Sequence, residues 1–380
     1  MFHGRILLLP GMLLSMAFAA SSAAGQGGPG LAPMEQAHTF AQVRTDDGIA
    51  TLLVVGLAEG AVRAVDLSAA NGHYGADAFD VIDGFSPAQL DAFARSAPQV
   101  RDYPLERLLG AGPRGLMHIA AGTNYPKHGE EVGMPQGAFL FPKLSPAGAP
   151  RTKVATAAGV LLDYEVEVCA RFDREIRTAG DFDAARKGFF LCGDYTDRAT
   201  LFRTIDLRNP YSGDGFADAK SGHDRFPAGP FLVVPHDWRR FLSGVRLRTY
   251  VDGHLRQDVR AADMIKGLDQ IVLEALGSVG KRTWSYRDGR IPMLRRPAIP
   301  AGSAVLTGTG DGVVFREPGP EVVGELMRAQ GREQQHAIID RYIAQEDAKG
   351  IYLQPGNRVR YESNWLGWID SEVVAASGPE

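Results

Sequence analysis

The sequence predicts a β-rich α+β fold, in which a small α+β domain precedes a larger domain built mainly of strands. Among its 380 residues are 45 glycines and 23 prolines, a content that favours turns and short strands over long helices. From about Leu105 onward, short apolar runs alternate with glycine, proline, asparagine and aspartate. The length itself indicates two domains, or one large domain with an appendage.

The first 24 residues are predicted to form a cleaved signal peptide. A short basic start is followed by the apolar residues 6–20 and then by the small residues 22–24, which suit signal peptidase. Pro10 interrupts the apolar run, which is too short for the roughly 20 residues that span a bilayer. We therefore expect an exported protein, periplasmic or secreted, with a flexible linker at residues 25–35 and no membrane association after cleavage.

The charge balance excludes one class of partner. Lys and Arg total 41 and Asp and Glu total 45, which gives a formal net charge of −4, and neither sign forms long runs. Nucleic acid demands a clustered basic surface, so no nucleic-acid partner is expected. A small molecule is the expected partner instead.

The two cysteines, Cys169 and Cys192, do not have the spacing of a zinc site. An exported protein could join them in a single disulfide. Two separate buried thiols are the favoured expectation.

The N-terminal domain is expected over residues 36–110. It contains an apolar run at residues 49–55 and a helix-like stretch at residues 86–94. Ser86 can cap that helix, and Pro87 suits its first position. These signals predict a small α+β unit.

The larger domain, residues 111–376, carries a clear hairpin signal. Residues 245–251 and 254–259 flank Asp252 and Gly253, a pair that tolerates the positive φ of a primed turn. An antiparallel hairpin is therefore expected here.

Two further strands and two insertions follow in this domain. The strands are expected at residues 304–306 and 358–362. Residues 281–296 form a basic, proline-containing insertion, and residues 321–347 form another whose apolar pattern suits helix. The second insertion is expected either to pack against the domain or to act as a lid.

Alternating acids mark a candidate metal site. If residues 163–168 form a strand, Asp163, Glu165 and Glu167 share one face and apolar side chains share the other. One interpretation is a solvated strand face. The other is a hard-cation site, because Mg²⁺ and Ca²⁺ prefer oxygen ligands and offset the repulsion between carboxylates. The segment alone leaves both interpretations open.

A histidine and a glutamate form a candidate acid–base pair. His128 precedes Glu131 by three residues, so on a helical turn the carboxylate can hold the imidazole and raise its basicity. A surface pair without function is the alternative. The sequence contains no Gly-x-Ser-x-Gly elbow, no His-Glu-x-x-His and no Walker loop. The glycines of residues 307–312 lack the spacing of a dinucleotide site.

Several motifs, taken together and in their order along the chain, resemble those of the fumarylacetoacetate hydrolase family over about residues 122–373. The matching motifs are Asn124-Tyr125-x-x-His128-x-x-Glu131, Asp163-Tyr164-Glu165-x-Glu167, Gly193-Asp194-Tyr195-Thr196-Asp197-Arg198, Lys220 ahead of Gly229-Pro230-Phe231-Leu232-Val233, Val251-Asp252-Gly253-x-x-x-Gln257, Asp263-Met264-Ile265, Ile299-Pro300-Ala301-Gly302-x-x-x-x-Thr307-Gly308-Thr309 and Leu353-Gln354-Pro355-Gly356-Asn357. Each motif is weak alone, whereas together and in this order they are specific.

The resemblance implies a mixed β-roll or sandwich of the family's C-terminal type, and a homodimer. It also implies a bound Mg²⁺, or Mn²⁺ or Ca²⁺, held by Glu165, Glu167 and Asp194. Some family members carry a fourth carboxylate at the position of Ala121. The resemblance therefore favours a three-carboxylate site in this chain.

The resemblance further assigns catalytic roles. His128, oriented by Glu131, would take a proton from water, which then attacks a substrate carbonyl. Lys220 and Thr309 would stabilise the developing oxyanion. Three residues are expected to contact substrate, namely Arg198, Tyr125 and Gly308, and Arg198 has the alternative role of ordering the metal loop.

Two departures from the family pattern concern the region of Lys220. Residues 203–219 are longer and more polar than the pattern, which makes them a third insertion. Beyond Lys220, residues 221–224 stand where the family has a Phe-Asp pair, as if one residue had been inserted. Substrate contacts are therefore expected to differ from those of other members.

The expected function is that of an exported, divalent-metal-dependent hydrolase that cleaves a carbon–carbon bond in an acylpyruvate or a related 1,3-dicarbonyl or 2-oxo acid. A 2-oxo acid decarboxylase or tautomerase, or a sugar-acid dehydratase, would use the same scaffold and a similar enolate. A non-catalytic small-molecule binding protein is the alternative from a different class.

Overall fold

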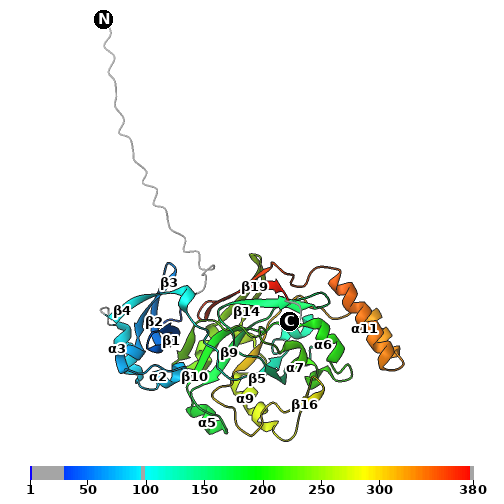
Figure 1. Ribbon diagram of the computed structural model, residues 1–380, viewed down its shortest axis with the longest axis horizontal. Coiled ribbons are helices and arrows are strands. Elements are labelled where there is room, and N and C mark those ends of the chain that lie inside the picture. Colours follow the sequence, from blue (N-terminus) through cyan, green and yellow to red (C-terminus); the bar gives the residue numbers. More distant parts are fainter. Residues whose placement is uncertain (2–29, 96–98, 377–380) are drawn as a thin grey trace.

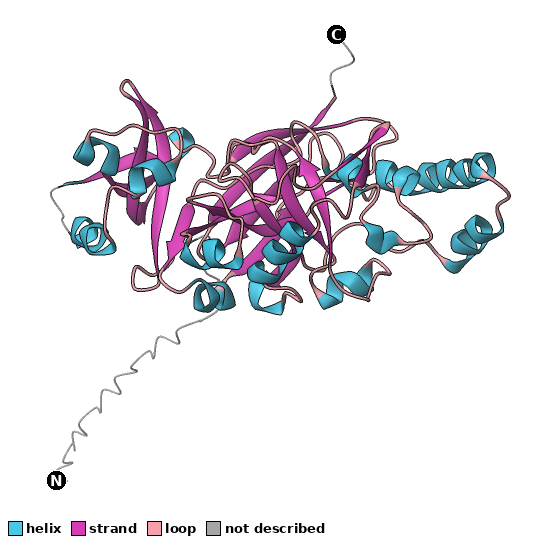
Figure 2. Ribbon diagram, turned by 90° about the horizontal axis from the view of Figure 1, so that it is seen from below, coloured by secondary structure: helices cyan, strands magenta, loops and turns pink. Residues whose placement is uncertain are grey.

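Two large β-sheets form the centre of the molecule, and helices surround them (Figures 1 and 2). The computed structural model describes residue 1, residues 30–95 and residues 99–376. The predicted signal peptide beyond Met1, and residues 25–29 of the predicted linker, lie outside the described residues. In the part that is described, no helix combines the length and apolar character needed to cross a membrane.

The first sheet has ten strands and is mixed. Its spatial order is β4 (Val100–Pro104), β3 (Ala61–Asp66), β2 (Gly48–Ala58), β1 (Ala37–Thr45), β12 (Leu232–Pro235), β10 (Lys187–Gly193), β9 (Val166–Phe172), β17 (Val305–Thr309), β5 (Met117–Gly122) and β6 (Phe139–Leu144). Strands β17 and β5 run parallel, and the other neighbouring pairs run antiparallel. Both β9 and β10 are buried along their whole length, so they form the centre of the core.

The second sheet packs on the centre of the first. Its order is β14 (His254–Arg260), β13 (Arg246–Val251), β18 (Arg358–Ser363), β19 (Gly367–Ala375) and β7 (Arg151–Thr156). Strand β13 contacts β9, and β18 and β19 contact β10. The turn between β13 and β14 has positive φ at Asp252 and Gly253, as a primed turn requires. The hairpin and the β-rich α+β fold are both confirmed.

Short helices and two small ribbons connect the sheets. The helices are α1 (Leu67–Asn71), α2 (Ala78–Ile82), α3 (Pro87–Arg95), α4 (Pro126–Glu131), α5 (Ala179–Ala184), α6 (Arg198–Thr204), α7 (Phe216–Lys220), α8 (Trp238–Gly244), α9 (Leu268–Gly277), α10 (Pro320–Arg328) and α11 (Arg332–Asp347). The ribbons are β8 (Leu162–Asp163) with β11 (Thr196–Asp197), and β15 (Trp284–Tyr286) with β16 (Gly289–Ile291). The predicted N-terminal helix is confirmed as α3, and the helical insertion as α10 and α11.

The N-terminal strands extend the same sheet that contains β9 and β10. Strand β1 pairs with β12, with Phe40 opposite Leu232, and β12 in turn pairs with β10. Figure 1 shows β1–β4 in blue and cyan at the end of the molecule opposite α11, which is orange. The central strands therefore connect an N-terminal end to an end formed by the helical insertion.

A disulfide joins β9 to β10. Cys169 and Cys192 are both fully buried and bonded to each other. The expectation of two separate thiols was wrong, because the antiparallel register places Phe190 opposite Cys169 and Glu167 opposite Cys192, which makes the cysteines diagonal neighbours. Sequence spacing alone does not reveal that register.

Candidate metal centre and active site

The ends of β9 and β10 bring the three predicted metal ligands together. Glu167 lies on β9, Glu165 directly precedes that strand, and Asp194 directly follows β10. The backbone N–H of Asp194 donates to the carbonyl of Glu165 at 2.9 Å. One carboxylate oxygen from each of the three residues lies within 4.8 Å of the other two. The spacing of these oxygens suits a single shared cation.

The carboxylates are buried, so the interpretation as a solvated strand face is wrong. Glu165 is 4% exposed, and Glu167 and Asp194 are each 1% exposed. The expected alternation of acidic and apolar residues along one strand is also incomplete, because β8 ends at Asp163 and β9 begins only at Val166. The Asp163 side chain has other partners. Its carboxylate accepts the backbone N–H groups of residues 314 and 315 at 2.9 and 3.1 Å. Asp163 is therefore not part of the three-carboxylate group.

Two predicted cations neutralise one side of this group. Lys220 Nζ lies 2.6 Å from Glu165, 2.7 Å from the Thr196 hydroxyl and 3.0 Å from Asp194. Burial opposes ionisation of Glu165, but the charges of Lys220 and Arg198 lower its pKa to about 2. Burial likewise disfavours the charged form of Lys220, yet Asp194 and Glu165 raise its pKa. Lys220 is therefore an ammonium group at neutral pH.

Arg198 is held by two carboxylates. Its Nη2 lies 2.6 Å from Glu165, and its Nε donates to Asp163 at 2.9 Å. The side chain is buried at the start of α6. Of its two expected roles, this geometry supports ordering of the metal loop, because both contacts are with carboxylates of the segment that leads into β9.

Sequence reasoning missed Lys143. This residue is fully buried on β6, and its Nζ lies 2.6 Å from Asp194 and also donates to the backbone carbonyls of Lys220 and Arg225. Burial lowers its pKa, against the charge of Asp194. A lone lysine within the apolar run of residues 139–144 is the sequence signal that could have revealed it.

Glu167 is the carboxylate that lacks a cation. Within the described residues no ion pair reaches it, and its Oε2 accepts only the N–H of Gly308, at 2.7 Å. Burial and the charges of Asp194 and Glu165 raise the pKa of Glu167 well above its usual value. Asp194 Oδ2 forms no hydrogen bond among the described residues, but Lys220 Nζ lies 3.0 Å from it. A divalent cation fits here, because it would supply the positive charge that Glu167 lacks and would bind carboxylate oxygens.

His128 lies beside this group on α4. Its ring is buried, and its Nδ1 is 3.4 Å from Glu131 Oε2. Glu131 is itself fixed to the loop after β17, where it accepts the N–H of Gly312 at 3.0 and 3.1 Å and pairs with Arg316 at 2.9 Å. The predicted pair is thus brought together, and the carboxylate holds the imidazole toward the cavity that His128 lines.

Thr309 and Gly308 lie at the end of β17. The Thr309 hydroxyl donates to the carbonyl of Val166 at 2.8 Å and accepts from Gln257 at 2.9 Å, and the residue lines the cavity. Gly308 has φ of +90°, and a Cβ there would come within 2.9 Å of Asn124 Cβ. Only glycine fits, and its N–H orients Glu167.

Tyr125 is buried at the N-cap of α4 and does not line the cavity, and neither does Gly308. The Tyr125 hydroxyl has no hydrogen-bond partner among the described residues. Burial and the charge of Glu167 raise its pKa. Tyr125 is therefore buried within electrostatic reach of the predicted metal ligand Glu167 and outside the cavity lining.

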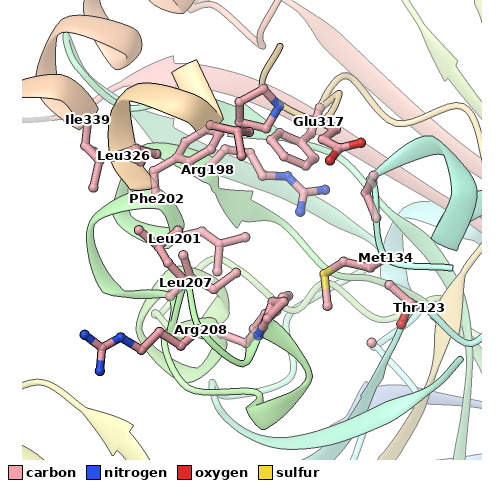
Figure 3. Close-up of a pocket in the computed structure, with 18 of the residues that line it drawn as sticks. Thr123, Met134, Arg198, Leu201, Phe202, Leu207, Arg208, Glu317, Leu326 and Ile339 are labelled. Atoms are coloured by element: carbon pink, nitrogen blue, oxygen red, sulfur yellow. The ribbon is translucent and has the colours of Figure 1, made fainter. Parts of the chain in front are cut away.

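A cavity of about 690 Å³ opens from the site. His128, Glu165 and Lys220 line its inner end. Apolar side chains form another part of the lining, and Figure 3 shows Leu201, Phe202 and Leu326 among them. The site thus combines a charged inner end with an apolar outer wall.

Comparisons with known proteins support an enzyme site. The model of the fumarylacetoacetate hydrolase C-terminal domain matches residues 117–374. A bifunctional isomerase/decarboxylase of 4-hydroxyphenylacetate degradation from Escherichia coli is 26% identical over 245 residues, which are 62% of this chain and 49% of the relative. The chain therefore spans about half the length of that relative. An uncharacterized protein from Archaeoglobus fulgidus is 27% identical over 230 residues, 59% of this chain and 80% of the relative.

Solved structures show the same fold. A fumarylacetoacetate hydrolase from Exiguobacterium antarcticum has a TM-score of 0.55 and 19% identity, and covers 89% of this chain and 100% of its own. A maleylpyruvate hydrolase from Sphingobium sp. SYK-6, in complex with manganese(II) and pyruvate, has a TM-score of 0.54 and 18% identity with the same coverage. The family model covers more than half of the sequence, and the chain belongs to the fumarylacetoacetate hydrolase family.

Proposed function

We propose that this protein is an exported, divalent-metal-dependent hydrolase that cleaves a carbon–carbon bond in an acylpyruvate or a related 1,3-dicarbonyl or 2-oxo acid. The observation that carries the proposal is a buried three-carboxylate group beside a histidine–glutamate pair, both at the inner end of one cavity. Glu165, Glu167 and Asp194 would hold Mg²⁺ or Mn²⁺. A bound cation would stabilise negative charge on adjacent substrate oxygens.

The proposed reaction adds water across one carbon–carbon bond. His128 takes a proton from water, and the hydroxide oxygen forms a bond to C4 of the acylpyruvate. The bond between C3 and C4 then breaks, its electron pair goes to C3, and C3 takes up a proton. The products are a carboxylic acid and pyruvate. Glu131 holds the imidazole during both proton transfers, because its own contacts with Gly312 and Arg316 fix its position.

The charged groups around the cavity have distinct proposed roles. Lys220 lines the cavity, and neighbouring carboxylates raise its pKa, so its ammonium group can stabilise an oxyanion at the attacked carbonyl. Thr309 lines the same wall, and its bonds to Val166 and Gln257 orient the hydroxyl. Arg198 positions Glu165 and does not contact substrate in this proposal.

The decisive experiment is metal-dependent turnover of 2,4-dioxopentanoate. We expect acetate and pyruvate in equal amounts, one solvent ¹⁸O atom in the acetate, and loss of activity with EDTA. His128→Ala should lower kcat by about 10²-fold or more, in the range typical of a lost general base. His254→Ala is the matched control, because His254 is exposed on the β13–β14 hairpin. Binding without any conversion would contradict the hydrolase and favour a binding protein.

Decarboxylation or isomerisation is the second candidate reaction, and the similarity to the bifunctional isomerase/decarboxylase from E. coli supports it. His128 can transfer a proton to carbon as readily as it can activate water. Release of carbon dioxide from a 2-oxo acid, without solvent ¹⁸O in a carboxylic acid product, would favour this candidate over hydrolysis.

Export also belongs to the proposal. The buried disulfide between Cys169 and Cys192 supports it, because disulfides persist mainly in oxidising compartments. Mass spectrometry of the mature N-terminus from a fractionated native host should show cleavage near Ala24, and a full-length cytoplasmic product would contradict export. The homodimer stays a prediction that sedimentation velocity would test.

A further inference from the structure

The cavity extends well beyond the charged groups. Its outer wall is formed by apolar side chains from α6, from the loop that follows it, and from α10 and α11. Those on which the argument depends are Leu201, Phe202, Ile205, Leu207, Leu326 and Ile339. Figure 3 shows Phe202, Leu326 and Ile339 together on one side of the cavity. This outer part is lined by apolar side chains, whereas the inner end is lined by His128, Glu165 and Lys220.

The outer part offers no suitable cation for a second substrate carboxylate. Among the described lining residues, the buried cations Arg198 and Lys220 are already paired with carboxylates. Arg208 is exposed, and Figure 3 shows its guanidinium at the margin, directed away from the other labelled side chains. Glu317 adds a negative charge to the lining. A distal carboxylate would be repelled here or left without a partner.

Helix α10 presents an apolar face to this space. Val323, Leu326 and Met327 line the cavity, and their spacing of three and four residues places them on one side of the helix. No residue of α10 is fully buried, and Met327 is 83% exposed. Leu326 packs partly against the cluster that contains Ile339, whereas Met327 is left uncovered, so protein covers this face only in part. An apolar ligand in the cavity would cover it.

We propose that the outer part of the cavity binds an uncharged apolar acyl group, so that the preferred substrates are acylpyruvates with a long alkyl or aryl substituent and not dicarboxylates. The inference rests on the proposed function and specifies its substrate class. The 2-oxo acid end lies at the carboxylates and His128, and the substituent lies against α6, α10 and α11. Each methylene buried there should raise kcat/KM roughly fourfold.

A substrate series tests this directly. The probes are 2,4-dioxopentanoate, 2,4-dioxooctanoate, 2,4-dioxo-4-phenylbutanoate and the dicarboxylate 2,4-dioxoheptanedioate. We expect kcat/KM to rise about sixtyfold from the methyl to the butyl substituent, since three methylenes each contribute roughly fourfold, and the dicarboxylate to be at least about tenfold poorer than 2,4-dioxooctanoate. Equal values along the series, or a preference for the dicarboxylate, would overturn the proposal.

A charge introduced on α10 should switch this preference. Leu326→Arg should lower kcat/KM for 2,4-dioxooctanoate about tenfold and raise it for 2,4-dioxoheptanedioate. Leu273→Arg is the matched control, because Leu273 is exposed on α9 and does not line the cavity. If Leu326→Arg does not fold, Met327→Arg makes the same test at an exposed position. An unchanged ratio between the two substrates in a folded variant would overturn the assignment of this wall.

A binding measurement separates this proposal from the hydrolase itself. If the protein converts none of the dioxo acids, the proposed reaction fails, and the cavity can still be probed with 2-oxopentanoate and 2-oxooctanoate by calorimetry in MgCl₂. Tighter binding of the longer acid, and loss of that difference in Leu326→Arg, would support the apolar site alone. Equal affinity for both acids would overturn it.

Discussion

Glu165 and Glu167 are two residues apart and equally buried, yet their environments are opposite. Glu165 has Arg198 and Lys220 as partners, whereas Glu167 has a backbone N–H and two neighbouring negative charges. Removal of the Glu165 charge takes one carboxylate partner from buried cations, whereas removal of the Glu167 charge relieves repulsion between carboxylates. The two substitutions to glutamine should therefore have different effects on stability.

We predict that Glu165→Gln lowers the free energy of unfolding by about 3 kcal/mol, near the lower end of the range for a broken buried ion pair. The loss is moderate because Arg198 remains paired with Asp163, and Lys220 remains paired with Asp194. Glu167→Gln should leave the metal-free stability unchanged or raise it, and should weaken Mn²⁺ binding at least about tenfold. Urea unfolding in EDTA and calorimetric titration with Mn²⁺ measure these effects. Strong destabilisation by Glu167→Gln without metal would contradict this account of the charges.

His118 provides a pH-dependent contribution to stability. Its Nε2 bonds the carbonyl of Ser145 at 2.8 Å, and its Nδ1 accepts the N–H of Ala304 at 3.0 Å, so the buried ring is neutral. Burial lowers its pKa to about 4, below the ordinary 6.5 that it has in the unfolded chain. The unfolded state therefore binds more protons between these values, and stability falls as the pH decreases from 6.5 toward 4.

The loss attributable to His118 should reach roughly 3 kcal/mol at pH 4. His118→Gln removes this titration, so the free energy of unfolding of the variant should decrease less than that of the wild type over the same pH range. Urea unfolding at several pH values gives the comparison, and His254→Gln at an exposed position is the control. Parallel pH profiles for His118→Gln and the wild type would show that the ring does not titrate in this way.

At the scale of elements, local signals were sufficient where one short segment determines its own structure. Asp252 and Gly253 predicted the β13–β14 hairpin, because few other residues adopt the required positive φ. Ser86 and Pro87 predicted the start of α3, where the Ser86 hydroxyl accepts the N–H of Gln89. Residues 321–347 predicted helix from their apolar pattern and form α10 and α11.

Features that depend on the pairing of distant strands were not predictable in this way. The disulfide follows from the register of β9 with β10, and the departure of Asp163 follows from bonds to residues 314 and 315, which are about 150 positions away. Lys143 contacts Asp194 although three strands, β9, β17 and β5, separate β6 from β10 in the sheet, so no local signal reveals this contact. The proximity of the three carboxylates was predictable, because Glu165 and Glu167 alternate along one short segment and Asp194 matched a family motif.

At the scale of the whole molecule, the division between the two predicted domains at residue 110 cuts through one sheet. Strand β12 is hydrogen-bonded to β1 on one side and to β10 on the other. Arg171 of β9 pairs with Asp77 and lies over the ring of Phe79, so a buried cation of the central sheet depends on the N-terminal segment. The strands that hold the metal ligands are thus supported from the N-terminal end.

We therefore predict that residues 111–380 alone do not form a stable protein. Truncation would expose the edge of β12, which invites pairing with other chains, and would leave Arg171 buried without Asp77. Compared with residues 25–380, the truncated chain should elute as aggregate in size-exclusion chromatography with light scattering, and should lack a cooperative calorimetric transition. A monodisperse product that melts within a few degrees of the longer chain would instead establish the N-terminal segment as an independent domain, and would show that the central sheet tolerates a free edge at β12.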